Sequence, residues 1–232
     1  CPDTSDFLCI AGPCSIENPG QVQAICKVIK SKGITFMRGG VYRAGTYPLE
    51  EFGLRQDLLS LWRAEAKLNG LKIIVEVLDI RQLEMISQYA DAIQVGARHM
   101  QDYALLTEVS TLNMTVALKR HPGSNVNEFL GAAEYLCRGR CKPLLIERGS
   151  STFMDHVRWD LCVSLIAEVK ARTKLPIIVD ASHGSGRREF VEPLTLAGIA
   201  AGADGFLVEV HPNPDNSLSD ARQAYKLAWF GD

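Results

Sequence analysis

Four potential metal ligands stand far apart in the sequence. They are one thiol, one imidazole and two carboxylates: Cys14, His183, Glu209 and Asp220. This mixture suits a divalent transition metal such as manganese, iron, cobalt or zinc, and suits magnesium poorly. A buried Cys at a strand end is usually a packing residue, but Cys14 follows the Gly12-Pro13 turn, which would lift its side chain out of the strand. We therefore predict a metal site that the fold assembles from distant segments.

A second set of residues is cationic and also lies at the ends of apolar segments. It comprises Arg38, Arg98, Lys119, Arg120 and Arg148. Cations that converge on one place repel one another unless an anion of high charge lies among them. The set therefore predicts a small ligand that carries phosphate and a carboxylate.

Eight short apolar runs, each bounded by Gly, Pro or polar residues, are the elements that must position these side chains. They span residues 7–13, 34–40, 72–78, 92–98, 115–120, 143–149, 176–183 and 205–212. Between them lie stretches with helical spacing of apolar residues, such as 21–32, 51–69, 127–138 and 155–173. Apolar runs without alternation indicate parallel strands that are covered on both faces. Eight such units predict an α/β fold, a single-domain (β/α)8 TIM barrel over residues 1–232.

A doubly wound open sheet is the alternative fold, but no G-x-G-x-x-G turn follows the first run. In a barrel, the carboxyl ends of the strands form the active site. Any one charged residue there can simply mark where a strand meets water, whereas repeated Arg, His and carboxylate groups on eight strands favour a site. Trp62 and Trp159 fall in helix-like segments, where we expect them to pack.

Composition excludes several classes of function. The chain has 25 basic and 27 acidic residues without a block of like charge, which argues against nucleic acid and anionic membranes as partners. No apolar run reaches the length of a membrane span, and the first residues lack the features of a signal peptide. The seven cysteines form an odd set without secretory context. We expect a cytoplasmic protein with reduced thiols.

Several motifs, in order along nearly the whole chain, resemble those of the type I DAHP synthases, and of their β subgroup in particular. They are Ala11-Gly12-Pro13-Cys14-Ser15, Gln94-Val95-Gly96-Ala97-Arg98, Leu118-Lys119-Arg120, Ile146-Glu147-Arg148-Gly149, Asp180-Ala181-Ser182-His183 with Gly186-Arg187-Arg188, Ala203-Asp204-Gly205, Glu209-Val210-His211-Pro212 and Leu218-Ser219-Asp220. The resemblance implies a (β/α)8 barrel that condenses phosphoenolpyruvate with an aldose phosphate, above all erythrose 4-phosphate. The products would be a 3-deoxy-2-keto sugar acid phosphate and inorganic phosphate, in the first step of the shikimate pathway to aromatic amino acids.

The resemblance also implies roles for individual residues. Cys14, His183, Glu209 and Asp220 would bind the metal; Arg38, Arg98, Lys119 and Arg148 would bind phosphoenolpyruvate; Lys119, Arg43 and His183 would take part in catalysis. A homo-oligomer, either a dimer or a tetramer, is expected on the same ground. A regulatory domain, which the family often carries, is not expected within this chain.

Two loops depart from the family pattern. The family's Lys-Pro-Arg-Thr-Ser-Pro reads Arg43-Ala44-Gly45-Thr46-Tyr47-Pro48 here, and Ser151 stands where a second family arginine is usual. Only Thr46 is left of the usual contacts to the acceptor phosphate. The acceptor therefore differs from erythrose 4-phosphate, or another cation replaces the missing arginines, or the loops have drifted with weaker acceptor binding. Candidates for the replacement are Arg187, Arg188 and His121, although a solvent-facing position is the expected one for His121.

Three rival functions stay open at this point. The first is the related synthesis of 3-deoxy-octulosonate 8-phosphate from arabinose 5-phosphate. The second is a Schiff-base aldolase that uses Lys119 as its nucleophile. The third is a catalytically inactive barrel that binds an anionic metabolite or a partner enzyme.

Overall fold

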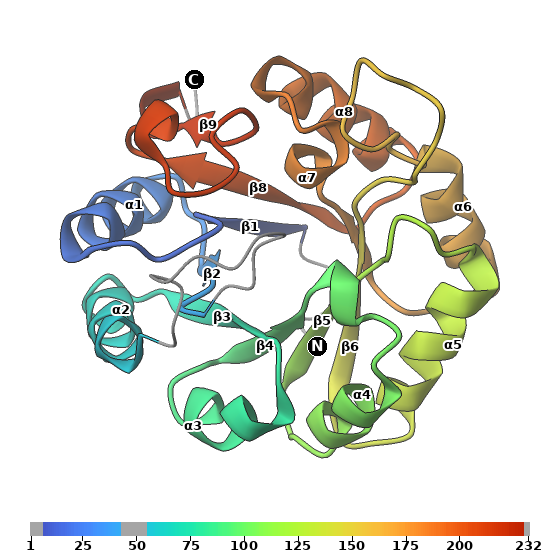
Figure 1. The fold of residues 1–232 in the computed structure, drawn as a ribbon, viewed down its shortest axis with the longest axis horizontal. Helices are drawn as coiled ribbons and strands as arrows, with labels where there is room; N and C mark the ends of the chain where they lie inside the picture. Colours follow the sequence, from blue (N-terminus) through green and yellow to red (C-terminus); the bar gives the residue numbers. More distant parts are fainter. Residues whose placement is uncertain (1–6, 43–54, 230–232) are drawn as a thin grey trace.

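Eight parallel strands close into a barrel in the computed structural model, which describes residues 7–42 and 55–229 (Figure 1). Each strand pairs with the next along the chain, and β1 pairs with β8 over the register Leu8 to Gly205 through Gly12 to Glu209. The strands are β1 (Leu8–Gly12), β2 (Phe36–Gly39), β3 (Lys72–Val77), β4 (Ala92–Val95), β5 (Thr115–Lys119), β6 (Lys142–Glu147), β7 (Ile177–Val179) and β8 (Gly205–His211). The closed pairing confirms the predicted (β/α)8 barrel and shows that the open-sheet alternative is wrong.

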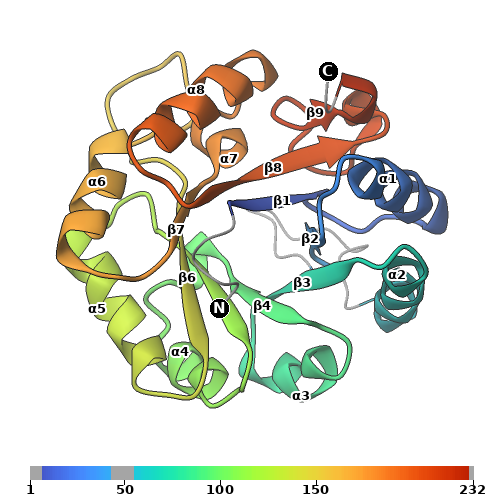
Figure 2. The same cartoon turned by 180° about the vertical axis from the view of Figure 1, so that it is seen from behind.

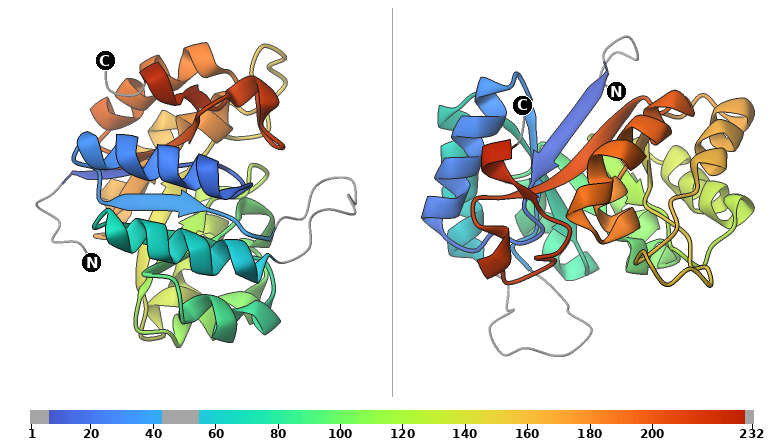
Figure 3. Two further views of the ribbon diagram at one scale, coloured as in Figure 1. Left: turned by 90° about the vertical axis from the view of Figure 1, so that its left-hand side faces the viewer. Right: turned by 90° about the horizontal axis from the view of Figure 1, so that it is seen from above.

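Helices surround the barrel, as the view from behind also shows (Figure 2). They are α1 (Pro19–Ser31), α2 (Gln56–Leu68), α3 (Leu83–Ser87), α4 (Tyr103–Ser110), α5 (Val126–Cys137), α6 (Val163–Arg172), α7 (Ala181–Ser185) and α8 (Arg188–Ala200). Short 3-10 turns lie at η1 (Ile80–Gln82), η2 (Ala97–His99), η3 (Pro214–Asn216) and η4 (Leu227–Trp229). Seen from the side, α1 and α2 run next to each other along the outside of the wall (Figure 3). None of the helices in the described ranges has the length and apolar character that crossing a membrane requires.

The sequence explains where these helices begin. The side chain of Asn18 accepts a hydrogen bond from the amide of Gln21, and Pro19 occupies the first turn of α1. At α5, Asn125 and Glu128 form a reciprocal capping box. The buried face of α1 then repeats at helical spacing through Val22, Ile25 and Ile29, so the helix packs firmly against the barrel.

The barrel has two separate apolar cores. The larger core lies between the strands and the helices and contains Trp62, Phe129 and most of the buried aliphatic residues. The smaller core contains only strand residues, which places it in the lumen. Its buried members are Ile10, Ile74, Ala92, Ala117, Leu144, Ile146, Ile178 and Leu207.

Several segments differ from the sequence prediction. The helix expected over 155–173 begins only at Val163, and Asp160 forms an antiparallel bridge with Ser150 in the preceding loop. The strand expected over 176–183 ends at Val179, because the carboxylate of Asp180 accepts the amide of His183 and starts the short helix α7. A further strand, β9 (Tyr225–Lys226), pairs in parallel with the end of β8 and was not expected from its two residues.

Candidate active site

The alternation of side chains along the strands places the polar residues in the lumen. Seven strands carry an apolar lumen residue followed, two positions later, by a polar one. The pairs are Phe36 and Arg38, Ile74 and Glu76, Ala92 and Gln94, Ala117 and Lys119, Ile146 and Arg148, Ile178 and Asp180, and Leu207 and Glu209. Because residues i and i+2 share one face of a strand, the polar set lies above the apolar floor, at the carboxyl ends of the strands.

A cavity of about 280 Å³ lies at this end of the barrel. Most of the site residues expected from the sequence line it, among them Cys14, Arg38, Arg98, Lys119, Arg148, His183 and Asp220. Glu209 is completely buried beside them. The cavity thus unites the expected metal ligands with the expected anion-binding cations.

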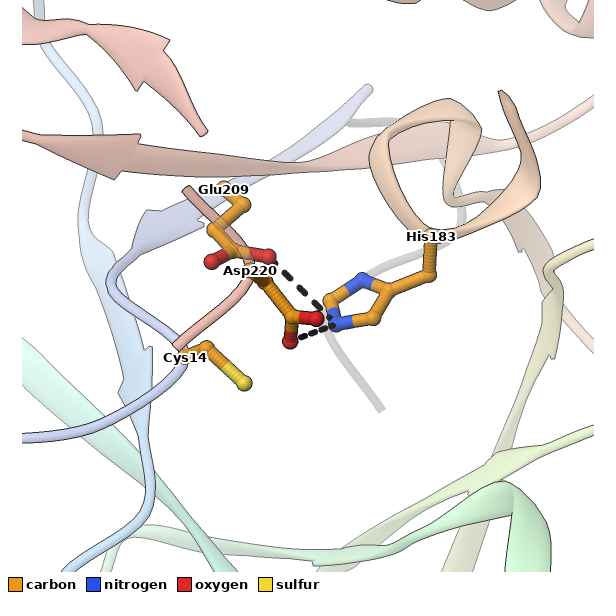
Figure 4. A group of neighbouring side chains, drawn as sticks. All are labelled: Cys14, His183, Glu209 and Asp220. Carbon is orange, nitrogen blue, oxygen red and sulfur yellow. Dashed lines mark ion pairs between the residues drawn. The ribbon is translucent and has the colours of Figure 1, made fainter. Parts of the chain in front are cut away.

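One ligand atom from each of Cys14, His183, Glu209 and Asp220 lies within 4.8 Å of the others. Figure 4 shows the four side chains pointing toward one another from the end of β1, from α7, from β8 and from the segment after β8. His183 Nε2 is 3.4 Å from Glu209 Oε2 and 4.0 Å from Asp220 Oδ2. Cys14, His183, Glu209 and Asp220 thus present one sulfur, one nitrogen and two carboxylates to a common point.

The surroundings of His183 fix its orientation and favour its neutral form. Nδ1 lies 2.9 Å from Asp180 Oδ2, while the guanidinium of Arg38, which can only donate, lies 3.3 Å from Nε2. We therefore assign the proton to Nδ1 and the lone pair to Nε2, which faces the other ligands. Burial lowers the pKa of His183 to about 3, so the imidazole is neutral near pH 7, as a metal ligand must be.

Glu209 is a buried carboxylate with an incomplete set of partners. Its Oε2 accepts a hydrogen bond of 2.8 Å from Gln223, whereas Oε1 has no hydrogen-bond partner among the described residues. Burial raises the pKa of Glu209 to about 8, an effect that Arg38, 3.9 Å away, only partly offsets. A bound cation would satisfy both the charge and the orphaned oxygen, so the donor set fits a divalent transition metal.

Asp180 joins the metal-ligand side of the cavity to the cationic side. Its Oδ2 lies 2.8 Å from Lys119 Nζ as well as near His183. Burial alone would raise the pKa of Asp180, but the hydrogen bond from His183 and the positive charge of Lys119 outweigh burial and hold the pKa well below its usual value. Asp180 therefore stays ionised and orients both neighbours.

Arg148 is held against an aromatic ring. Its guanidinium carbon lies 5.5 Å from the centre of the Trp159 ring, a cation–π contact. Burial lowers the pKa of Arg148 to about 10, which still leaves the side chain charged near neutral pH. Gly149 has a φ of 98°, and a Cβ there would lie 2.6 Å from Trp159 Cβ. The glycine thus permits the close approach of the Trp159 segment.

Arg120 is in a different place from the other cations. It lies one residue beyond Lys119, so it projects from the opposite face of the strand, and it does not line the cavity. Its Nη2 is 3.0 Å from Glu147 Oε1 and 2.8 Å from Ser150 Oγ. The expectation that Arg120 belongs to the anion cradle is corrected to a buried ion pair in the barrel wall.

Arg187 and Arg188 do not line the cavity that contains the metal ligands. They line a separate hollow of about 840 Å³, where Arg187 pairs with Glu189 and Arg188 donates to the carbonyl of Ala221 at 2.8 Å. His121, the third candidate for holding the acceptor, does line the cavity. Arg43 and Thr46 lie outside the described residues.

Sequence reasoning missed several residues of the site. Arg158 and Trp159, expected to be helical, line the cavity from the loop before α6, and His99 lines it from η2. Gln223 contacts Glu209 from the segment after β8. The spacing of these residues from the strands carries no periodic signal, although the glycine at position 149 marks a place where another segment approaches.

The sequence of this chain is similar to sequences of known proteins. A sequence model of the "DAHP synthetase I family" matches residues 3–230. The chain is 39% identical to "Phospho-2-dehydro-3-deoxyheptonate aldolase" of Thermotoga maritima over 97% of its own length and 67% of that protein. It is 29% identical to "2-dehydro-3-deoxyphosphooctonate aldolase" of Desulfotalea psychrophila over 95% of its length and 85% of that protein.

Solved structures with similar sequences have the same fold. The crystal structure of the Thermotoga maritima DAHP synthase superimposes with a TM-score of 0.92 at 37% identity, covering 97% of this chain and 66% of that one. A truncated form of the Thermotoga maritima enzyme gives a TM-score of 0.88 at 37% identity, covering 97% of this chain and 82% of that one. The chain thus spans about two thirds of the full-length Thermotoga protein. The match over nearly all of its residues shows that this chain belongs to the DAHP synthetase I family.

Proposed function

We propose that this chain catalyses a metal-dependent condensation of phosphoenolpyruvate with an aldose phosphate, with erythrose 4-phosphate as the first candidate. The products are a 3-deoxy-2-keto sugar acid phosphate and inorganic phosphate, which makes the reaction the first step of the shikimate pathway. The single observation that carries this proposal is the shared cavity. Four metal-ligand atoms within 4.8 Å of one another lie beside Arg38, Lys119 and Arg148.

The cationic side of the cavity suits phosphoenolpyruvate. Arg98, Lys119 and Arg148 supply three positive charges for its phosphate and carboxylate, and the buried Arg38 adds a fourth. Arg38, Lys119 and Arg148 are buried, which strengthens such contacts, since water screens them less. Asp180 and Trp159 hold Lys119 and Arg148 in place before the substrate binds. These side chains therefore lose little conformational entropy on binding.

The opposite side suits the acceptor. Cys14, His183, Glu209 and Asp220 would hold manganese, iron, cobalt or zinc. A metal ion bound there would act as a Lewis acid that polarises the acceptor carbonyl. The Nδ1 proton of His183 points toward the carboxylate of Asp180, so the Nε2 lone pair of the ring is directed at the site.

In this reaction C3 of phosphoenolpyruvate forms a bond to the aldehyde carbon, whose oxygen takes up a proton. Water adds at C2, and the bond between C2 and the bridging oxygen breaks, so that inorganic phosphate leaves and the 2-keto group forms. The negative charge that develops on the leaving phosphate is stabilised by Arg98, Lys119 and Arg148.

For the identity of the acceptor there is a specific alternative. Gly45 and Ser151 replace two arginines of the family pattern, and several relatives are named 2-dehydro-3-deoxyphosphooctonate aldolases. Arabinose 5-phosphate or an unphosphorylated sugar is therefore the second candidate. Loss of one charge-assisted contact to phosphate typically costs about 1.5–3 kcal/mol, which is roughly ten- to a hundredfold in affinity.

The test is phosphoenolpyruvate consumption with release of phosphate, measured after chelation and after addition of manganese. Erythrose 4-phosphate, arabinose 5-phosphate and unphosphorylated aldoses are compared in parallel. Metal-dependent turnover with erythrose 4-phosphate supports the proposal. Turnover only with a different aldehyde would identify that aldehyde as the acceptor in place of erythrose 4-phosphate. Absence of turnover despite tight binding of phosphoenolpyruvate would favour an inactive anion-binding barrel.

The Schiff-base alternative has a separate test. Lys119 Nζ lies 2.8 Å from Asp180 Oδ2, an arrangement that suits an ammonium group in an ion pair better than a nucleophilic amine. Borohydride reduction in the presence of a carbonyl substrate should therefore leave Lys119 unmodified. A covalent adduct on Lys119, detected by peptide mass spectrometry, would favour the Schiff-base aldolase.

The proposal also includes a homo-oligomer in a cytoplasmic setting, with residues 1–232 as one barrel domain. These parts rest on the family alone. Light scattering during size-exclusion chromatography measures the mass of the particle, and a dimer or tetramer is the expected result.

A further inference from the structure

We infer that Arg158 and Gln223 form a hydrogen-bonded bridge that sets the positions of the two carboxylate ligands, Glu209 and Asp220. Both are positioning residues for the metal site. The inference rests on the proposed function, because it assumes that these carboxylates bind a metal. It goes further by assigning a role to two residues outside the ligand set.

The contacts of the bridge form a continuous chain. Gln223 Nε2 donates to Glu209 Oε2 at 2.8 Å, and Gln223 Oε1 accepts from Arg158 Nη1 at 3.1 Å. The same Nη1 donates to Asp220 Oδ1 at 3.1 Å. One end of each carboxylate is thereby fixed. The chain leaves Glu209 Oε1 without a hydrogen-bond partner among the described residues, and it does not use Asp220 Oδ2, the oxygen 4.0 Å from His183 Nε2.

Burial makes the bridge hard to replace. Glu209 is 0% exposed and Gln223 is 2% exposed, so water has poor access to the carboxylate if the amide is removed. The two carboxylates also repel each other, and Asp220 contributes to the raised pKa of Glu209. The positive charge of Arg158, paired with Asp220 at 3.1 Å, offsets part of this repulsion. The bridge therefore keeps two like charges at a spacing that a cation can use.

The backbone around Asp220 brings Gln223 into position. Asp220 has a φ of 54°, a left-handed conformation that Asp tolerates better than most residues. Its carbonyl accepts hydrogen bonds from the amides of Gln223 at 3.0 Å and Ala224 at 3.2 Å. This tight turn folds the chain back so that Gln223 reaches Glu209 on β8.

A second close approach fixes Arg158. Its amide donates to the carbonyl of Ser185 at 2.8 Å, next to Gly186 at the end of α7. Gly186 has a φ of 66°, and a Cβ there would lie 2.5 Å from Arg158 Cβ. Arg158 is thus locked between the end of α7, which carries His183, and the segment that carries Asp220. Partners of metal ligands that are held in this way typically change metal affinity by about 10- to 100-fold when removed.

The experiment is a titration of the chelated chain, residues 1–232, with Mn²⁺, in which electron paramagnetic resonance reports the free ion. Arg158→Ala and Gln223→Leu each remove one link, and Arg222→Ala, which removes a neighbouring exposed arginine, is the matched control. We expect each bridge variant to bind Mn²⁺ about 10- to 100-fold more weakly. The double variant should lose less than the product of the single losses, because both residues belong to one network.

Two further readouts separate positioning from general packing. The visible spectrum of the Co²⁺-loaded chain reports the ligand geometry and should change in both bridge variants but not in Arg222→Ala. Arg158→Lys keeps a cation but lacks the planar fork, and should restore part of the lost Mn²⁺ affinity. A melting temperature that falls equally with and without metal, at unchanged Mn²⁺ affinity, would overturn the inference in favour of a packing role.

The remaining outcomes are also decisive. Because Arg158 lines the cavity, a raised KM for a substrate at wild-type Mn²⁺ affinity would overturn the bridge and make Arg158 a substrate contact. If the loss of Mn²⁺ affinity in the double variant equals the product of the two single losses, the two residues do not belong to one network. If the unmodified chain and Cys14→Ser bind Mn²⁺ equally, the metal site itself fails, which is distinct from failure of the bridge alone.

Discussion

Lys119 and Arg120 are adjacent in sequence but lie on opposite faces of the barrel wall. Lys119 Nζ lies 2.8 Å from Asp180 Oδ2 at the cavity, whereas Arg120 Nη2 lies 3.0 Å from Glu147 Oε1, away from the cavity lining. The twofold alternation of a strand therefore places one of two similar cations at the cavity and the other in a buried ion pair of the wall.

Replacement of Arg120 should therefore act on stability. Arg120→Met leaves Glu147 completely buried without its ionic partner, and loss of one partner of a buried pair typically costs about 3–5 kcal/mol. Urea denaturation of the metal-free chain measures the free energy of unfolding. A loss below about 1 kcal/mol would contradict the structural role of this pair, because that is the range of exposed pairs.

Replacement of Lys119 should act on substrate binding. Lys119→Met removes one cation from the cavity, and we expect phosphoenolpyruvate to bind roughly ten- to a hundredfold more weakly. Quenching of Trp159 fluorescence during a phosphoenolpyruvate titration provides the measurement. Arg120→Lys, which preserves charge in the wall, serves as the comparison, and equal losses of affinity in both variants would contradict the division of roles.

The raised pKa of Glu209, about 8 without metal, predicts a pH dependence of stability. A carboxyl whose pKa is higher in the folded chain stabilises the fold fully below its ordinary pKa, 4.5, and this contribution is lost as the pH rises through 8. The chelated chain should therefore lose stability between pH 6.5 and 9, by up to about 1.4 kcal/mol per pH unit. The chosen range lies above the ordinary pKa of His183, 6.5, so that residue adds little.

The measurement for Glu209 is the unfolding free energy from pH 6.5 to 9, with Glu209→Gln as the reference. The difference in unfolding free energy between the unmodified chain and Glu209→Gln should shrink or reverse as the pH rises. Bound manganese should abolish the loss of stability with pH in the unmodified chain. Parallel pH profiles for the two chains would show that Glu209 titrates normally.

Much of this site could be predicted from the sequence, because strand ends and motifs are local signals. Cys14, Glu209 and the cations Arg38, Lys119 and Arg148 lie at or next to the ends of parallel strands of one barrel, whereas motifs alone pointed to Asp220. The position of Arg120, one residue after Lys119, also predicts that the two side chains lie on opposite faces of the strand. Arg158 and Gln223 were not foreseeable in this way, because irregular segments bring them in and only tertiary hydrogen bonds define their place.

Gly149 should be intolerant of a side chain. At a φ of 98°, Gly149→Ala would add strain and force Trp159 away, at a combined cost of about 2 kcal/mol or more. Because Trp159 contacts Arg148, the affinity for phosphoenolpyruvate should fall together with stability. Gly131→Ala in α5 is the control: its Cβ meets nothing within 4 Å, so it should stabilise the chain by about 0.5–1 kcal/mol. Denaturation and phosphoenolpyruvate titration of both variants provide the measurement. Equal changes in stability and in affinity for the two variants would contradict the role of Gly149.

The most direct test of the central claim follows the bridging oxygen of phosphoenolpyruvate. With ¹⁸O in that position, the proposed condensation breaks the bond between C2 and the bridging oxygen, so mass spectrometry should find the label in inorganic phosphate. Release should require both a divalent metal and an aldose acceptor. Label retained in the keto acid, or phosphate released without an acceptor, would contradict the condensation.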